Sequence, residues 1–257
     1  MPTITHNGVK LAYDSRGKGK PAFVFIHGWT CDRSFFAPQA KHFARRHRVV
    51  SVDLRGHGQS DKPEGPYPIS NYSDDIAFLI DTLRLGKVIA VGHSMGGITV
   101  LQLAADHPDK VAGIVMVDPA PLVFPPELRT AFDGMVAAIE AGNQEPRRQV
   151  IANNLFLKTS DKKLVKRVLK VMMASSPRIA ADAMKGILAF DGAAVAARCT
   201  VPALHLAATP PLNPPHLMTQ CLPNVVNGWT VGAGHFNMME APEQVNSMIG
   251  AFLRHHV

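Results

Sequence analysis

The sequence predicts an α/β fold with a mostly parallel central sheet, helices on its flanks and a helical insertion. Strand-like and helix-like segments alternate from residue 22 to 118, which favours consecutive βαβ units. Residues 121–190 then show helical periodicity only, and the alternation resumes at residue 203. We therefore expect a sheet-based core formed by residues 1–120 and 191–257. Residues 121–190 are expected to form a helical cap over the strand ends.

The first half of the chain reads as a hairpin followed by strand–helix units. Two short strands surround an Asn7-Gly8 turn, a dipeptide typical of tight hairpins. The following strands are continuous apolar runs, as expected of strands covered on both faces. Strands are predicted at 22–26, 49–52, 88–91 and 111–117, and helices at 34–44, 71–85 and 97–107.

The second half begins with the cap and returns to the sheet. Within the cap, residues 162–173 carry apolar side chains at helical spacing. Beyond the cap, strands are predicted at 203–207 and 225–231, and helices at 214–221 and 242–255. A glycine-rich turn at 232–235 separates the last strand from the closing helix.

Composition limits the class of protein. The 257 residues are 46% hydrophobic, which is enough for one sizeable core. The net charge of +7 comes without a basic tail or zinc-finger spacing, so no nucleic-acid partner is expected. Most of the excess positive charge falls between residues 121 and 190. It is interpreted as a solvated helix face or as an attraction for anionic substrates.

Targeting and redox signals point to a soluble cytoplasmic protein. We further expect a monomer or homodimer with a small-molecule partner and no membrane partner. No apolar run approaches the roughly 20 residues of a membrane span, and the N-terminus lacks the features of a signal peptide. The cysteines Cys31, Cys199 and Cys221 are odd in number and lack metal-ligand spacing. Neither a metal nor a cofactor is expected.

One short motif suggests the chemistry. The apolar run 88–91 leads into Gly92-His93-Ser94-Met95-Gly96, a G-x-S-x-G pattern between a strand and a helix. In such a nucleophile elbow the serine backbone is strained and its hydroxyl stands clear at the sheet edge. The amides that open the helix then point toward negative charge developing beside Ser94.

Four motifs occur in a characteristic order. They are His27-Gly28-Trp29, the stretch from Asp53 to Ser60, the stretch from Gly92 to Gly97, and Gly234-His235-Phe236 followed by Glu240 and Pro242. With these motifs the chain resembles the α/β-hydrolase superfamily over essentially its whole length. The resemblance implies that Ser94 is the nucleophile and that His235, in the loop after the last strand, is its base. His93 is expected to point away from the side of its neighbour. The Asp53–Ser60 stretch is expected to be structural, with Arg55 in a buried salt bridge.

The acid of the expected triad departs from the commonest family pattern. Most members carry it after the strand that follows the cap, but residues 207–213 contain no carboxylate. Asn213 could orient an imidazole there without stabilising its positive charge. Asp118, at the end of a core strand, is our predicted acid, a position that some superfamily members use, including lactone-cleaving hydrolases and cofactor-free dioxygenases. Asp191 at the cap exit is the other candidate, and an Asp-Pro turn is the structural alternative for Asp118.

The resemblance also implies the remaining site residues and the reaction. The backbone N–H groups of Trp29 and Met95 should form the oxyanion hole. Serine at the elbow favours hydrolysis of an ester or lactone through an acyl-enzyme. Cofactor-independent dioxygenase chemistry, carbon–carbon bond hydrolysis and a binding module without turnover remain alternatives. The side chains expected to line the substrate pocket are His93, Phe124, Phe132 and Phe156.

Overall fold

The computed structural model describes residues 1–257 and contains one eight-stranded sheet in the order β1-β2-β4-β3-β5-β6-β7-β8. β1 pairs antiparallel with β2, and β2 pairs antiparallel with β4, whereas the remaining pairs are parallel. The strands are β1 (Thr3–His6), β2 (Val9–Arg16), β3 (Ala22–Ile26), β4 (Val49–Val52), β5 (Val88–His93), β6 (Val111–Val117), β7 (Ala203–Ala207) and β8 (Val226–Trp229).

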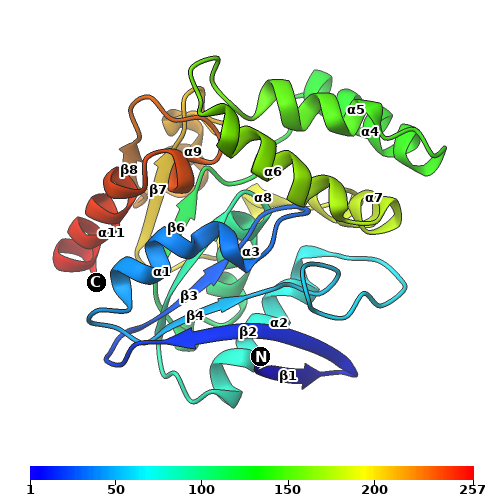
Figure 1. Cartoon of the computed structure of the whole chain (residues 1–257). Helices are drawn as coiled ribbons and strands as arrows, with labels where there is room; N and C mark the ends of the chain where they lie inside the picture. Colours follow the sequence, from blue (N-terminus) through cyan, green and yellow to red (C-terminus); the bar gives the residue numbers. More distant parts are fainter.

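Helices cover both faces of the sheet. In Figure 1, α1 and α11 lie in front of the sheet, while α2 and α3 lie behind it. The helices outside the 121–190 segment are α1 (Ala37–Phe43), α2 (Ile69–Thr82), α3 (Met95–Asp106), α8 (Gly192–Ala196), α9 (Pro215–Cys221), α10 (Asn237–Glu240) and α11 (Pro242–His256). Short 3₁₀ turns span Arg33–Phe36 and Pro108–Lys110. The strands β3, β4, β6 and β7 have the predicted bounds, because each is a mostly apolar run with nearly all of its residues buried.

Residues 121–190, called the cap segment below, contain helices only. These are α4 (Pro126–Glu140), α5 (Glu145–Gln149), a π-helical turn at Val150–Asn154, α6 (Lys162–Ala174) and α7 (Pro177–Leu188). Figure 1 shows them gathered above one edge of the sheet, in green to yellow. Parallel strands present their carboxyl ends at one edge, which is where ligands bind in folds of this class. No helix of the protein is both long and apolar enough to cross a membrane.

Candidate active site

Ser94 occupies a strained turn between β5 and α3. Its φ of 54° and ψ of −116° lie outside the regions that L-residues ordinarily adopt. The turn requires glycine on both sides, because a Cβ on Gly92 would lie 1.9 Å from the carbonyl oxygen of Gly96. A Cβ on Gly96 would lie 2.2 Å from the carbonyl oxygen of Ile26 in β3. The predicted elbow geometry is therefore present, and Ser94 opens onto a cavity at the sheet edge.

Asp118 and His235 are in direct contact. His235 Nδ1 lies 2.6 Å from Asp118 Oδ2, and Asp118 is 0% and His235 7% exposed. Asp118 follows β6 with a φ of 38°, a left-handed conformation that aspartate tolerates better than most residues. Its other carboxylate oxygen accepts hydrogen bonds of 3.3 Å from the amides of Ala208 and Leu212. Every side of this buried carboxylate is thus supplied with donors.

The loop that carries His235 is held by two partners. The His235 amide donates to the carbonyl oxygen of Leu155 in the cap segment at 3.0 Å, and the Gly234 amide donates to Glu240 Oε1 at 3.1 Å. The second oxygen of Glu240 accepts from the hydroxyl of Ser160. Glu240 ends the short helix α10, and its carboxylate holds this loop in place.

His93 lies beside His235, and the prediction that it points away from Ser94 is wrong. The two imidazole centroids are 4.5 Å apart, and His93 Nε2–H donates to the carbonyl oxygen of His235 at 2.9 Å. Burial, and secondarily the nearby His235, lowers the pKa of His93 well below its ordinary value, so the ring is neutral. Alternation along a strand puts neighbours on opposite faces, but β5 ends at His93 and the elbow redirects Ser94. Both side chains therefore line one cavity.

Two backbone amides at this edge lack an acceptor in the protein. Met95 begins α3, so its N–H has no intrahelical partner. The N–H of Trp29, in the loop after β3, donates to no protein atom either. These are the two amides that the sequence predicted for an oxyanion hole.

The cavity beside Ser94 is small and apolar, with a volume of about 70 Å³. The predicted pocket residues Phe124 and Phe132 line it, and so do Met172 and Met184 of the cap segment. Phe156 does not line it, contrary to the prediction. Its ring stacks on Phe236 at 5.1 Å between centroids and faces a neighbouring surface cleft. The full lining is Trp29, Cys31, His93, Ser94, Ala120, Pro121, Phe124, Leu128, Phe132, Val150, Leu155, Met172, Met184, Ile187, Leu212, His235 and Phe236.

Comparison with known proteins agrees with this architecture. A family model described as the alpha/beta hydrolase fold matches residues 21–242. The chain belongs to this family.

Individual relatives differ in how much of this α/β hydrolase they match. A putative carbamate hydrolase, RutD of Caulobacter vibrioides, is 28% identical over 258 residues and 95% of each chain is covered. The 2-(acetamidomethylene)succinate hydrolase of Mesorhizobium japonicum is 40% identical over 137 residues, which cover 52% of this chain and only 48% of the relative. The enol-lactonase of Burkholderia xenovorans superposes with a TM-score of 0.89 at 24% identity, covering 98% of this chain and 100% of the other, and shows the shared fold.

The other predicted acid and the asparagine of this α/β hydrolase have structural contacts. Asp191 accepts from the Ala194 amide at 3.0 Å and thereby caps α8. Asn213 donates to the carbonyl oxygen of Pro119 at 2.8 Å and accepts from the Leu122 amide at 2.9 Å. Asn213 thereby holds the backbone of residues 119–122, just after Asp118, in place. Neither side chain is bonded to His235.

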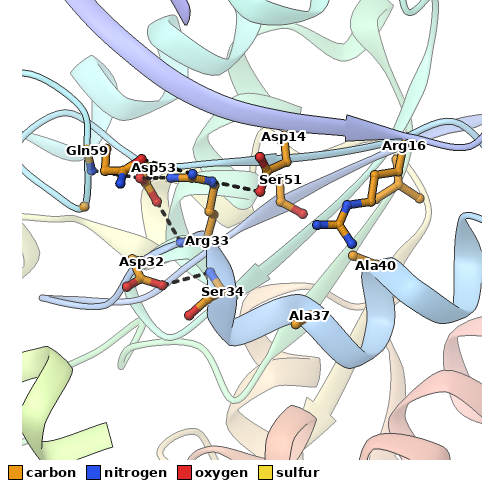
Figure 2. Close-up of a pocket in the computed structure, with 12 residues that line it drawn as sticks. Asp14, Arg16, Asp32, Arg33, Ser34, Ala37, Ala40, Ser51, Asp53 and Gln59 are labelled. Atoms are coloured by element: carbon orange, nitrogen blue, oxygen red, sulfur yellow. Dashed lines mark hydrogen bonds and ion pairs between the residues drawn. The ribbon is translucent and has the colours of Figure 1, made fainter. Parts of the chain in front are cut away.

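The Asp53–Ser60 motif supports the fold, as predicted. The carboxylate of Asp53 accepts from the amides of Arg33 and Gln59 at 2.8 Å each and pairs with the Arg33 guanidinium. Arg55 forms an ion pair of 2.7 Å with Asp75, whose side chain is almost fully buried. Figure 2 shows Arg33 between Asp53 and Asp14, with both of which it forms ion pairs. These residues line a polar surface cleft with a volume of about 270 Å³. This cleft is larger than the cavity at Ser94, but none of the predicted site residues lines it.

No cluster of His, Cys, Asp or Glu side chains is arranged to hold a metal ion.

Proposed function

We propose that the protein hydrolyses a small carboxylic ester or lactone through an acyl-enzyme on Ser94, with His235 as base and Asp118 as acid. The observation that carries this proposal is the 2.6 Å contact between Asp118 and His235 beside the cavity that Ser94 also lines. A serine hydroxyl is a weak nucleophile unless a base accepts its proton, and the base must be held in one tautomer.

The proposed steps follow from the donors and acceptors present. With its Nδ1–H donated to Asp118, the imidazole of His235 presents Nε2 as the acceptor for the Ser94 proton. The Ser94 oxygen bonds to the substrate carbonyl carbon while the carbonyl oxygen takes the negative charge. The free amides of Trp29 and Met95 would donate to that oxygen. His235 then passes its proton to the leaving alcohol, and water activated by the same ring cleaves the acyl-enzyme.

The cavity supports a short, apolar acyl group. Its volume of about 70 Å³ is well below the roughly 300–1,000 Å³ of pockets for drug-sized ligands. Of its seventeen lining residues, thirteen are hydrophobic, and buried His93 is uncharged. The lining of the cavity offers no charged side chain that would pair with a charged acyl group. An ester whose acyl chain is short and uncharged therefore fits best.

The decisive experiment is covalent labelling combined with turnover. Wild type and Ser94→Ala would be treated with a fluorophosphonate and assayed on 4-nitrophenyl acetate, butyrate and octanoate, a small lactone, a carbamate and 2-(acetamidomethylene)succinate. We expect stoichiometric labelling at Ser94, fastest turnover of the short esters, and a loss of about 10³-fold or more in Ser94→Ala.

Three other outcomes would replace the proposal. Cleavage of the carbamate or of the succinate derivative without ester cleavage would move the substrate class toward those named for the two relatives. Oxygen uptake with a quinolone-like substrate would indicate a cofactor-independent dioxygenase. Cleavage of a β-diketone would indicate a carbon–carbon bond hydrolase. No labelling and no turnover would indicate a binding module.

A further inference from the structure

Trp29 connects the cap segment to the loop that follows β3. Its indole Nε1–H donates to the carbonyl oxygen of Ala180 in α7 at 2.8 Å, across 151 positions of sequence. The residue is 6% exposed and lines the cavity beside Ser94. The same residue supplies one of the two free amides at the sheet edge. A movement of the indole would therefore be passed to this amide through a single residue.

Arg147 of α5 contacts the same indole from the cap. Its guanidinium carbon lies 5.5 Å from the centroid of the Trp29 ring, and the residue is only 1% exposed. Its hydrogen-bond partners are the carbonyl oxygens of Met172 and Ser175 and the side-chain oxygen of Gln144, none of them a carboxylate. Its Nε has no partner. Burial lowers the pKa of Arg147 to about 10, so it remains a cation at neutral pH.

Burying the Arg147 cation without a carboxylate partner is unfavourable for the stability of the fold. A buried charge without a counter-ion loses much of its hydration, which the carbonyls and the ring face replace only in part. The carbonyls that Arg147 binds belong to the end of α6 and the residue after it, so the guanidinium joins α5, α6 and the Trp29 ring at one point.

We propose that Arg147 is a positioning residue, which together with the Ala180 carbonyl holds the Trp29 indole and so couples the seating of the cap to the oxyanion hole. This inference rests on the proposed function, because it assigns the Trp29 amide to the oxyanion. An oxyanion-hole donor contributes through its placement, and a misplacement of about 1 Å at a reacting centre costs roughly a hundredfold in rate. Met172 and Met184 of the cap also line the cavity, so a substrate that packs against them would keep the cap, and with it the amide, in place.

The test separates placement of the amide from general stability. Arg147→Met and Trp29→Phe would be assayed on 4-nitrophenyl butyrate, and their affinity for a boronic acid analogue of the tetrahedral intermediate would be measured. We expect kcat to fall 10- to 100-fold with KM changed less than threefold, and the inhibitor to weaken by the same factor as kcat/KM. Arg147→Lys, which keeps the charge but not the planar fork, should fall between wild type and Arg147→Met.

Arg178→Met is the matched control. Arg178 of α7 also joins the cap segment to the core, donating to the carbonyl oxygens of Lys62 and Pro63 at 3.2 Å each, but it does not touch Trp29. Its kcat should stay within twofold of wild type. An equal loss of kcat in Arg178→Met, or a loss in Arg147→Met that appears in KM alone, would overturn the coupling.

A second readout is independent of turnover. The protein has two tryptophans, so Trp229→Phe leaves Trp29 as the only indole fluorophore. In that background Arg147→Met should shift the emission to longer wavelength and increase quenching by acrylamide, with the far-UV circular dichroism unchanged. Unchanged emission would overturn the role of Arg147 even if esterase activity is found. Absent turnover and labelling would instead count against the proposed function, because the emission shift does not depend on it.

Discussion

Asp118 Oδ2 and His235 Nδ1 meet at 2.6 Å, joining the end of β6 to the loop after β8 across 117 positions of sequence. Of the two candidate acids, only Asp118 contacts His235, because the Asp191 carboxylate accepts from the Ala194 amide at the N-terminus of α8.

The first prediction concerns that contact. Asp118→Asn retains the shape of the side chain but removes the negative charge that would stabilise a protonated His235. We expect kcat on a short 4-nitrophenyl ester to fall by about 10⁴-fold. Asp191→Asn, the matched carboxylate-to-amide control, should keep kcat within about twofold of wild type. Comparable activity in the two variants would show that Asp118 is not the acid.

The second prediction concerns Glu240. Glu240→Ala removes the acceptor for the Gly234 amide and the partner of the Ser160 hydroxyl, so the loop that carries His235 should loosen. Hydrogen bonds to a charged group contribute roughly 1.5–3 kcal/mol each, and we expect a loss of about 2 kcal/mol in unfolding free energy with kcat lowered about tenfold. Urea unfolding and initial rates measure the two quantities.

Two further variants test whether the carboxylate of Glu240 itself holds the loop. Glu240→Gln keeps an acceptor for the Gly234 amide and should recover most of kcat. Glu243→Ala removes an exposed carboxylate three residues later and should change neither quantity. If Glu240→Ala matches Glu243→Ala in both measurements, the loop is held by other contacts.

The regular elements were the part most readily predicted from sequence. Buried strands such as β3 and β6 are continuous apolar runs, and the G-x-S-x-G spacing follows from backbone contacts that exclude a Cβ. Boundaries governed by turns were less accurate. The helix predicted at 71–85 spans Ile69–Thr82, because it begins directly after Pro68 and a left-handed Arg84 (φ 51°) turns the chain just beyond its end.

The contacts that complete the site could not be predicted. Trp29 and Ala180, or Gly234 and Glu240, are joined by single hydrogen bonds that leave no periodicity or motif in the chain. His93 was misjudged because strand alternation ceases to apply at the elbow. Phe156 was misplaced because adjacent residues of the cap segment face different clefts, Leu155 the cavity at Ser94 and Phe156 the surface.

The third prediction concerns stability at acid pH. Burial, with a smaller contribution from His27, lowers the pKa of His57 to about 3 from an ordinary value of 6.5. Below pH 6.5 the unfolded chain binds a proton that the folded protein does not accept until about pH 3, so the fold loses stability as the pH falls. This one group should cost at most about 2 kcal/mol between pH 7.5 and pH 5.0. The lowered pKa values of His27, His93 and His205 act in the same direction.

Urea unfolding at the two pH values measures this effect. Between pH 7.5 and pH 5.0 the unfolding free energy of His57→Asn should drop by up to about 2 kcal/mol less than that of wild type. This comparison holds whatever the stability of the variant at pH 7.5. A proton NMR titration of wild type should show the His57 ring signals unchanged between pH 8 and pH 5. Parallel losses in both proteins, or a titrating His57, would contradict the prediction.

The last prediction concerns the charge of the cap segment. Residues 158–170 carry six basic side chains and one acid, a net +5 out of +7 for the whole chain. All six basic side chains are exposed and none forms an ion pair with a carboxylate, and the single acid, Asp161, caps α6. Lys158, Lys162 and Lys166 line a surface cleft together with Phe156, whose neighbour Leu155 lines the cavity at Ser94. An ester whose leaving group is anionic should therefore be drawn toward the site.

The measurement compares 4-acetoxybenzoate with its neutral methyl ester at 10 and 300 mM salt. We expect kcat/KM for the anionic ester to fall about 3- to 10-fold with added salt, and the neutral ester to change little, because the charges are exposed and screened. Substituting Lys158, Lys162 and Lys166 together with glutamine should abolish the effect of salt on kcat/KM for the anionic ester. Removing Lys41, Arg45 and Arg46, which lie before β4 at the opposite edge of the parallel strands, should preserve it. An equal effect from both triple variants would mean that net charge alone, and not this surface of the cap, attracts the anion.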